Sequence, residues 1–305
     1  MASHDHAAHG HQHAPPADMG AAFAIGIGLN TLFVAAEVAA GLMSGSLALL
    51  ADAGHNLSDV LALGLAWGAS VLARRAPTGR RTYGFRKATI LASLANAVVL
   101  LLAVGAIASE AIHRFGAPAP VATNIVMLTA GLGVLINGLT AMLFLRGQGD
   151  LNVRGAFLHM ASDAAVSLAV VIGALVMART GLGWIDPALS LLIGAVIVWG
   201  TWSLLRESAD LALDAAPRGV DVEAVRHWLA DLPGVAEIHD LHIWAMSTTE
   251  TALTAHLLRP ENSDGDAFLR SACEGLEHRF RIGHATLQIE TDPAAACRLA
   301  PAEVV

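Results

Sequence analysis

Six long apolar stretches, separated by short polar connections, most constrain how this 305-residue chain can fold. The hydrocarbon core of a bilayer is crossed by about 20 apolar residues in a helix. We expect Ser46 to cap the second of these helices. We expect Asp186, followed by Pro187 at the first helical position, to cap the sixth. The sequence predicts six membrane-spanning helices, at Ala21–Met43, Ser46–Leu72, Thr89–Ile112, Val121–Leu145, Arg154–Met177 and Asp186–Leu205.

The overall composition supports a membrane protein. Hydrophobic residues make up 55% of the chain and charged residues 14%, whereas soluble proteins have about 25% charged residues. A formal net charge of −8 argues against a nucleic-acid partner, which requires a basic surface. The two cysteines, Cys273 and Cys297, form no CxxC pair and cannot build a disulfide scaffold. These observations favour a multi-pass membrane protein with a smaller soluble part.

The distribution of basic residues predicts the orientation in the membrane. Lys and Arg concentrate in connections on the cytoplasmic side. The connections after the third and fifth predicted spans, which face the other side of the membrane, contain only Arg114 and Arg179 as Lys or Arg residues. We therefore expect a protein of the inner membrane with both termini in the cytoplasm. The basic side carries Arg74, Arg75, Arg80, Arg81, Arg86, Lys87, Arg146, Arg154, Arg206 and Arg218.

A polar pattern recurs inside two otherwise apolar helices. His55 to Asp59 and His159 to Asp163 both have the sequence H-x-x-S-D. Residues four apart lie on one helix face, so each helix presents an imidazole and a carboxylate to the same side. If the two faces meet, two nitrogen and two oxygen ligands converge, a set that zinc accepts in tetrahedral geometry. The alternative is that each His–Asp pair only satisfies itself by hydrogen bonding. Two matching pairs favour a metal site, because ionisable groups in a membrane are costly and usually functional.

Four further polar residues are candidates for supporting this site. Asp52 lies on the same face of the second span, where it either lines an access path or is an ordinary interfacial residue. Glu37 is a lone carboxylate in the first span that must be paired or protonated if it is buried. Ser58 and Ser162 either donate hydrogen bonds to the ligands or bond back to helix carbonyls, which is the commoner arrangement.

A short histidine-rich segment, residues 1–18, precedes the first span. Such a tract is typical of metal capture. The alternative, a cloning tag, is disfavoured by the irregular spacing. The candidate ligands are His4, His6, His9, His11 and His13.

From about Asp210 the sequence becomes mixed and polar. A helical period near Val222 precedes two predicted strands, Val235–Met246 and Thr249–Leu258. A second helix begins after Asn262 or Ser263 and is expected to close at Gly283. The last strand alternates, with Ala285, Leu287 and Ile289 facing inward. The order α-β-β-α-β predicts a two-layer α+β domain. We therefore divide the chain into a tail at 1–18, a membrane domain at 19–208, a cytoplasmic domain at 209–293 and a tail at 294–305.

This C-terminal domain is acidic, with fourteen Asp and Glu against seven Arg from Arg218 onward. Two such domains side by side would repel each other, and bound cations would relieve the repulsion. The alternative is a solvated sheet face with scattered histidines. The candidate ligands are His239, His242, His256, His284, Glu290 and Asp292.

Three segments together resemble the cation diffusion facilitator family, and most closely its bacterial zinc, cadmium and cobalt efflux members. They are Ser44–Asp59, His159–Asp163 and Ile238–Trp244. The resemblance implies a homodimer that exchanges a divalent metal ion for protons. It places the metal at His55, Asp59, His159 and Asp163, and implies a ferredoxin-like dimerisation domain with regulatory metal sites near His239 and His256. The connection Arg74–Gly84 lacks the Asp and His ligands that some members have there, so we predict no metal in it.

The leading hypothesis is a secondary transporter that exports zinc, with cadmium and cobalt as further candidate ions, and that contacts membrane lipids. Zn²⁺ would be the transported substrate and a candidate regulatory ligand, with no resident cofactor. One alternative is an intramembrane zinc enzyme. However, four protein ligands leave no open coordination position, and the sequence has no HExxH motif. The other alternative is a membrane-anchored metal sensor.

Overall fold

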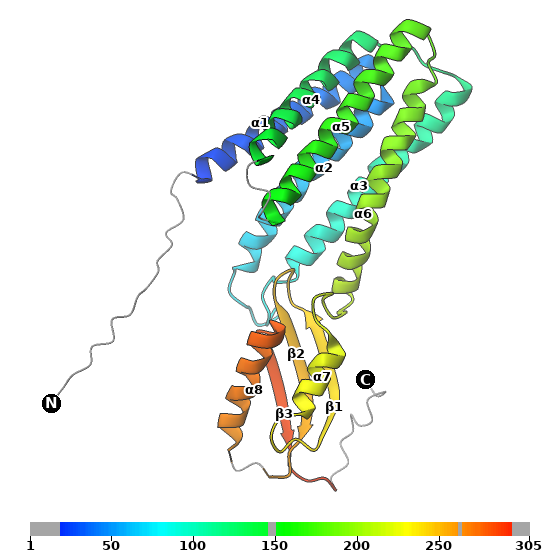
Figure 1. Ribbon diagram of the computed structural model, residues 1–305. Coiled ribbons are helices and arrows are strands. Elements are labelled where there is room, and N and C mark those ends of the chain that lie inside the picture. Colours follow the sequence, from blue (N-terminus) through cyan, green and yellow to red (C-terminus); the bar gives the residue numbers. More distant parts are fainter. Residues whose placement is uncertain (1–18, 146–150, 262–263, 295–305) are drawn as a thin grey trace, which may run out of the picture.

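The computed structural model describes residues 19–145, 151–261 and 264–294. It consists of a bundle of long helices with a small α+β domain at one end (Figure 1). The N-terminal histidines and residues 295–305, which include Cys297, lie outside the described residues.

Six long helices form the bundle, so the predicted helical membrane part is confirmed. Five are long and apolar enough to cross a membrane, and in the first helix the residues Thr31–Ser44 form a shorter apolar segment. The observed ends differ from the predicted ones by a few residues, most at α6, which continues past Leu205. The helices are α1 Met19–Ser44, α2 Leu47–Ala73, α3 Ala88–Gly116, α4 Thr123–Phe144, α5 Leu151–Thr180 and α6 Ile185–Ala212.

The helices pack as two groups. Helices α1, α2, α4 and α5 lie together, and α3 and α6 form a pair that packs on α2 (Figure 1). Short connections reverse the chain each time, so α2 and α5 run antiparallel. The buried core of the bundle is formed by small and branched side chains of several helices, including Leu49, Val126, Val170, Ala174 and Ile193.

The predicted cap of α2 is confirmed and that of α6 is wrong. Ser46 caps α2, its hydroxyl accepting a hydrogen bond from the Leu49 N–H at 3.1 Å. Helix α6 begins after Trp184, and Asp186 lies within its first turn. The buried Asp186 carboxylate instead accepts hydrogen bonds from the Ser46 hydroxyl at 2.5 Å and the Leu47 N–H at 2.7 Å. It serves the start of α2 because free N–H groups and the positive end of the helix dipole favour an anion there.

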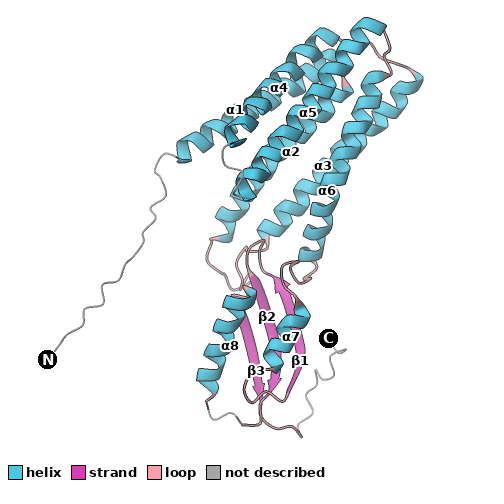
Figure 2. Ribbon diagram, viewed as in Figure 1, coloured by secondary structure: helices cyan, strands magenta, loops and turns pink. Residues whose placement is uncertain are grey.

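The C-terminal domain has the predicted order α-β-β-α-β. The elements are α7 Val222–Ala230, β1 Glu237–Ala245, β2 Thr251–Leu258, α8 Gly265–Phe280 and β3 His284–Glu290. The sheet order is β1-β2-β3, with β2 antiparallel to β1 and parallel to β3. Both helices cover one face of the sheet (Figure 2), and Leu229, Leu253 and Leu276 are fully buried between the layers.

The ends of α8 differ from the sequence prediction. The two predicted cap residues, Asn262 and Ser263, lie outside the described residues, and Asp264 precedes the helix without a side-chain cap. The helix closes at Arg281, which has a left-handed backbone (φ 58°) and donates its N–H to Glu277. Gly283 is therefore not the closing residue, because the chain already turns at Arg281. The predicted inward alternation of β3 is confirmed, since Ala285, Leu287 and Ile289 pack against the core.

Ion pairs connect the bundle to the α+β domain. Arg86 pairs with Glu250, and the Lys87 amine lies 2.5 Å from the Asp214 carboxylate. The Thr248 N–H also donates to the Thr89 hydroxyl at 3.1 Å. The connection between α2 and α3 and the first turn of α3 therefore dock the domain at one end of the bundle.

Candidate metal centre

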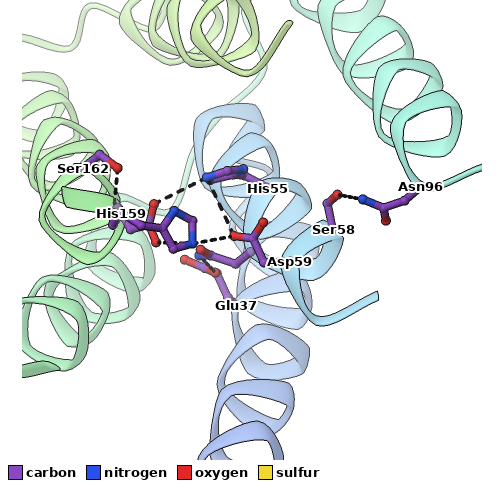
Figure 3. A network of polar contacts seen from close by, with 9 residues as sticks. Glu37, His55, Ser58, Asp59, Asn96, His159 and Ser162 are labelled. Carbon is purple, nitrogen blue, oxygen red and sulfur yellow. Dashed lines mark hydrogen bonds and ion pairs between the residues drawn. The ribbon is translucent and has the colours of Figure 1, made fainter. Parts of the chain in front are cut away.

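The two H-x-x-S-D segments meet between α2 and α5. His55 and Asp59 come from α2, and His159 and Asp163 come from α5. One ligand atom from each residue can be chosen so that all four lie within 4.8 Å of one another (Figure 3). Asp59 lies near the middle of α2, so the cluster lies near the middle of the bundle.

Each histidine faces the carboxylate of the other helix. His55 Nε2 lies 3.4 Å from Asp163 Oδ1 and 3.9 Å from Asp59 Oδ2. His159 Nε2 lies 3.3 Å from Asp59 Oδ2 and 3.7 Å from Asp163 Oδ2. This alternation follows from the antiparallel helices, because the order histidine then aspartate is reversed in space on α5. Nitrogen and oxygen ligands therefore alternate around the centre.

The cluster is more exposed on the side of the α+β domain. Asp59 and His159 lie nearer that domain, and their side chains are 34% and 44% exposed. His55 and Asp163 lie one helical turn farther away, and their side chains are 27% and 4% exposed. The centre is therefore partly exposed at both levels, and more so at the level of Asp59 and His159.

Asp52 and Glu37 lie deep in the bundle. Asp52 has no exposed surface and accepts a hydrogen bond from the Ser167 hydroxyl on α5 at 2.8 Å, so it is not an interfacial residue at an exposed helix end. Glu37 is equally buried and accepts from the Asn56 amide at 3.0 Å (Figure 3). Both carboxylates tie neighbouring helices to α2, and nothing in the described contacts places either at the centre itself.

The two serines of the repeated motif do not contact the four clustered side chains in the described structure. The Ser162 hydroxyl donates to the His159 carbonyl at 2.7 Å, the back-bonding alternative. Ser58 accepts from the Asn96 amide on α3 at 3.2 Å (Figure 3). Their roles are local helix bonding for Ser162 and helix–helix contact for Ser58.

The arrangement can hold a divalent ion of borderline softness. Two imidazoles and two carboxylates suit zinc in tetrahedral geometry, whereas an all-oxygen set would suit magnesium, calcium or manganese. The nitrogen and oxygen atoms of the four side chains lie 3.3 to 3.9 Å apart, close enough that small side-chain movements would bring them onto one ion. All four must be deprotonated at their ligand atoms to bind it, so metal and protons compete for the centre.

A second cluster lies on the sheet of the α+β domain. His239 and His256 are directly opposite in the β1–β2 register, and Glu290 ends β3 beside them. Glu290 Oε1 lies 3.0 Å from His256 Nδ1, and Glu290 Oε2 lies 3.3 Å from His239 Nε2. The latter contact lacks hydrogen-bond alignment, so neither ring nitrogen of the buried His239 is hydrogen-bonded in the structure. These three of the six candidate residues can converge on one ion.

Asp240 belongs beside this cluster, although the sequence analysis did not select it. Its carboxylate lies 2.8 Å from His242 Nε2 and 3.5 Å from His256 Nε2. A bulge shifts the register between His239 and His242, and Asp240 has a positive φ of 50°. The sequence feature that points to Asp240 as a candidate ligand is its position between His239 and His242. Regular alternation would have placed its side chain on the face of His242 but on the opposite face from His239 and its strand partner His256.

The remaining candidates lie elsewhere. His284 is at the opposite end of β3, where its ring contacts Tyr83 with centroids 5.6 Å apart. Asp292 follows β3 and accepts from the Ala294 N–H at 2.9 Å. In the described structure neither is part of the three-residue cluster.

Known cation efflux proteins are similar to this chain over nearly its whole length. The family model of the cation efflux transmembrane domain matches residues 23–211, and that of the cation efflux protein cytoplasmic domain matches residues 217–292. The chain is 35% identical to the metal cation efflux system protein CzcD of Cupriavidus metallidurans, covering 93% of this chain and 90% of that protein. It is 36% identical to the zinc transporter ZitB of Escherichia coli, covering 95% and 93%.

A further relative and a solved domain structure are also similar to this chain. The chain is 32% identical to the cadmium, cobalt and zinc/H(+)-K(+) antiporter of Bacillus subtilis, covering 86% of each protein. Among solved structures, the metal-bound C-terminal domain of CzcD from Cupriavidus metallidurans is 33% identical, with a TM-score of 0.22, covering 23% of this chain and 99% of that domain.

Proposed function

We propose that this chain, which belongs to the cation efflux family, exports zinc across the inner membrane in exchange for protons. The observation that carries the proposal is the cluster of His55, Asp59, His159 and Asp163 in the middle of the bundle. The expected resemblance to the cation diffusion facilitators is confirmed by the family models and by relatives that are named as metal transporters.

The ligand set supports zinc as the main substrate. Two nitrogens and two oxygens match zinc, and the same set accommodates cadmium and cobalt. The similar proteins are named for zinc, or for cadmium, cobalt and zinc together. We therefore propose zinc first, with cadmium and cobalt as further substrates.

Competition between metal and protons would supply the coupling. A zinc ion that reaches the centre displaces protons from its ligands, and protons arriving from the other side displace the zinc. Alternating access would then need the centre to open first at one end of the bundle and then at the other. The greater exposure of Asp59 and His159 supports a form open toward the α+β domain. The naming of the Bacillus subtilis relative as a proton-linked antiporter supports this coupling.

We place both termini in the cytoplasm and propose a homodimer. The basic residues gather at the end of the bundle that carries the α+β domain, which is the cytoplasmic side by the positive-inside rule. Contact between two acidic α+β domains would bring negative charge together. Zinc bound by His239, His256 and Glu290 would reduce that repulsion and so favour a particular arrangement of the domains.

The two alternatives are less well supported. An intramembrane zinc enzyme needs an open coordination position for water or substrate, and the centre offers four protein ligands. The relatives are named as transporters, which does not favour an enzyme. A metal sensor without transport would bind zinc but would not move it.

Zinc flux into vesicles that contain only the purified chain separates these functions. We expect a pH gradient to drive zinc uptake by the wild type. Asp163→Ala should abolish uptake while the protein stays folded and inserted, because it removes one of four ligands. Ser162→Ala is the matched control, since among the described residues its hydroxyl bonds the carbonyl of His159 and none of the four clustered side chains. Normal flux in a correctly inserted Asp163→Ala protein would contradict the assigned site.

The cytoplasmic cluster is tested separately by zinc titration of the purified full chain. The double variant His239→Ala and His256→Ala should lose one class of zinc binding while the membrane site keeps its own. His284→Ala is the control, because it lies at the other end of β3. Equal zinc stoichiometry in the double variant and the wild type would count against this second site.

A further inference from the structure

The connection between α2 and α3 is an ordered basic loop. Thr78 and Arg81 exchange backbone hydrogen bonds, each 3.0 Å long. Gly84 has a positive φ of 67°, and a Cβ there would lie 3.2 Å from the Arg75 carbonyl. The turn therefore depends on glycine and brings its two ends close together. This loop presents its side chains from a fixed backbone.

Two kinds of cation occur in this loop. Arg86 and Lys87 are paired with carboxylates of the α+β domain. Arg80 and Arg81 are exposed, and within the described part of the chain neither has a carboxylate partner. The guanidinium of Arg81 is held over the Phe85 ring, 4.5 Å from its centroid. The loop thus offers two charges that no acidic side chain among the described residues neutralises, and that of Arg81 is held in place by the Phe85 ring.

These arginines line an open pocket of about 400 Å³. Its other walls include Tyr83, the first helical turn of α3 at Leu91, and Trp244 and Met246 from the α+β domain. Leu91 is 55% exposed and begins the apolar surface of a helix long enough to cross the membrane. The pocket is therefore cationic at the loop and apolar where it meets α3.

We propose that this pocket binds the headgroup of an anionic phospholipid. The phosphate would lie between Arg80 and Arg81, and the first methylene groups of an acyl chain would lie along Leu91. Arginine is suited to this contact, because its guanidinium offers a fork of donors to phosphate oxygens. The apolar wall distinguishes this ligand from free phosphate or a nucleic acid, which have no hydrocarbon to place there.

Binding here would also affect the domain junction. The same loop carries Arg86, which pairs with Glu250, and Tyr83, whose ring contacts His284. A lipid held by Arg80 and Arg81 would reduce the mobility of the segment that docks the α+β domain. The inference goes beyond the proposed transport of zinc and does not depend on it.

The experiment is native mass spectrometry of the purified full chain without zinc, after reconstitution in phosphatidylcholine bilayers with or without phosphatidylglycerol. We expect retained phosphatidylglycerol but not phosphatidylcholine. The double variant Arg80→Ala and Arg81→Ala should weaken retention by roughly ten- to thirty-fold, from two lost arginine contacts at the membrane surface. The matched control, Arg74→Ala and Arg75→Ala, removes two positive charges from the same loop but outside the pocket.

Four outcomes of the mass spectrometry would overturn the proposal. They are equal losses in the two double variants, no loss in either, equal retention of phosphatidylcholine, and displacement of the lipid by inorganic phosphate alone. A second measurement addresses a loop that fails to fold. Quenching of Trp244 by phosphatidylglycerol brominated on its acyl chain, corrected with Trp244→Phe, should exceed quenching by brominated phosphatidylcholine. The variant Arg80→Lys and Arg81→Lys should keep part of that difference, and no difference in the wild type would refute the site.

Discussion

The antiparallel packing of α2 and α5 predicts the effect of exchanging ligands on one helix alone. The double substitution His55→Asp and Asp59→His keeps two imidazoles and two carboxylates. However, it places a carboxylate opposite Asp163, where His55 Nε2 now lies 3.4 Å from that residue. It also places an imidazole opposite His159. The composition of the site is unchanged, but like groups then face each other.

The cost follows from the distance. Two carboxylates about 4 Å apart repel by about 4 kcal/mol at an effective dielectric constant of about 20. In the wild type one oxygen of Asp59 already lies within 4.8 Å of one oxygen of Asp163, where the same repulsion is about 3.5 kcal/mol. The exchange therefore adds about 0.7 kcal/mol of repulsion, which favours a retained proton that zinc must then displace. We expect zinc transport at neutral pH to fall by roughly three-fold and to recover as the pH is raised.

The decisive comparison is the exchange on both helices. Adding His159→Asp and Asp163→His restores an imidazole opposite each carboxylate, so transport should return close to the wild-type level. The assay is zinc flux in vesicles across a pH series, with folding and insertion checked for each variant. Wild-type transport by the one-helix exchange would refute the reasoning. So would equal impairment of both exchanges in folded, inserted proteins.

Three further predictions concern capture, selectivity and domain stability. Deleting residues 2–14 should reduce flux at scarce zinc but leave the maximal rate unchanged, and a fall in maximal rate would contradict metal capture by the tail. His55→Asp should keep some zinc transport, lose preference for zinc over cadmium or manganese, and be most active at higher pH, which flux measurements for each ion can check. A charged hydrogen bond from Arg259 lowers the pKa of Asp264 below its ordinary value. The ion pair therefore stabilises the domain when the pH is above the ordinary pKa of the carboxyl, and this stabilisation is lost as the pH falls through the lowered pKa. Asp264→Asn should therefore lower the thermal unfolding midpoint at neutral pH but change it less in acid, and an equal effect at both would exclude the ion pair as the cause.

Local patterns predicted much of this structure. Six helices followed from apolar length, because backbone groups in a membrane must be satisfied within each segment. The order of elements in the α+β domain followed from the change between helical and alternating periods. The repeated H-x-x-S-D pattern selected four candidate ligands, because a spacing of four places two side chains on one helix face whatever the helix packs against.

Other features depended on contacts between distant segments. The sequence could not show that Asp186 serves the start of α2 and not the start of its own helix, since the partner groups are about 140 residues away. Asp240 reaches His256 because a bulge gives it a positive φ, whereas its spacing of two residues from His242 already favours that contact. A backbone irregularity of this kind overrides the alternation on which strand predictions rest.

The sequence by itself determined which four residues of the membrane centre can bind a metal, and the tertiary structure decided how they meet. Each helix fixes its own histidine and aspartate about one turn apart. Only the antiparallel packing of α2 on α5 places each histidine beside the other helix's aspartate, at 3.4 Å for His55 and 3.3 Å for His159. Which faces meet, and in which direction, is set by side-chain packing along both helices, and the spacing within either one carries no information about it.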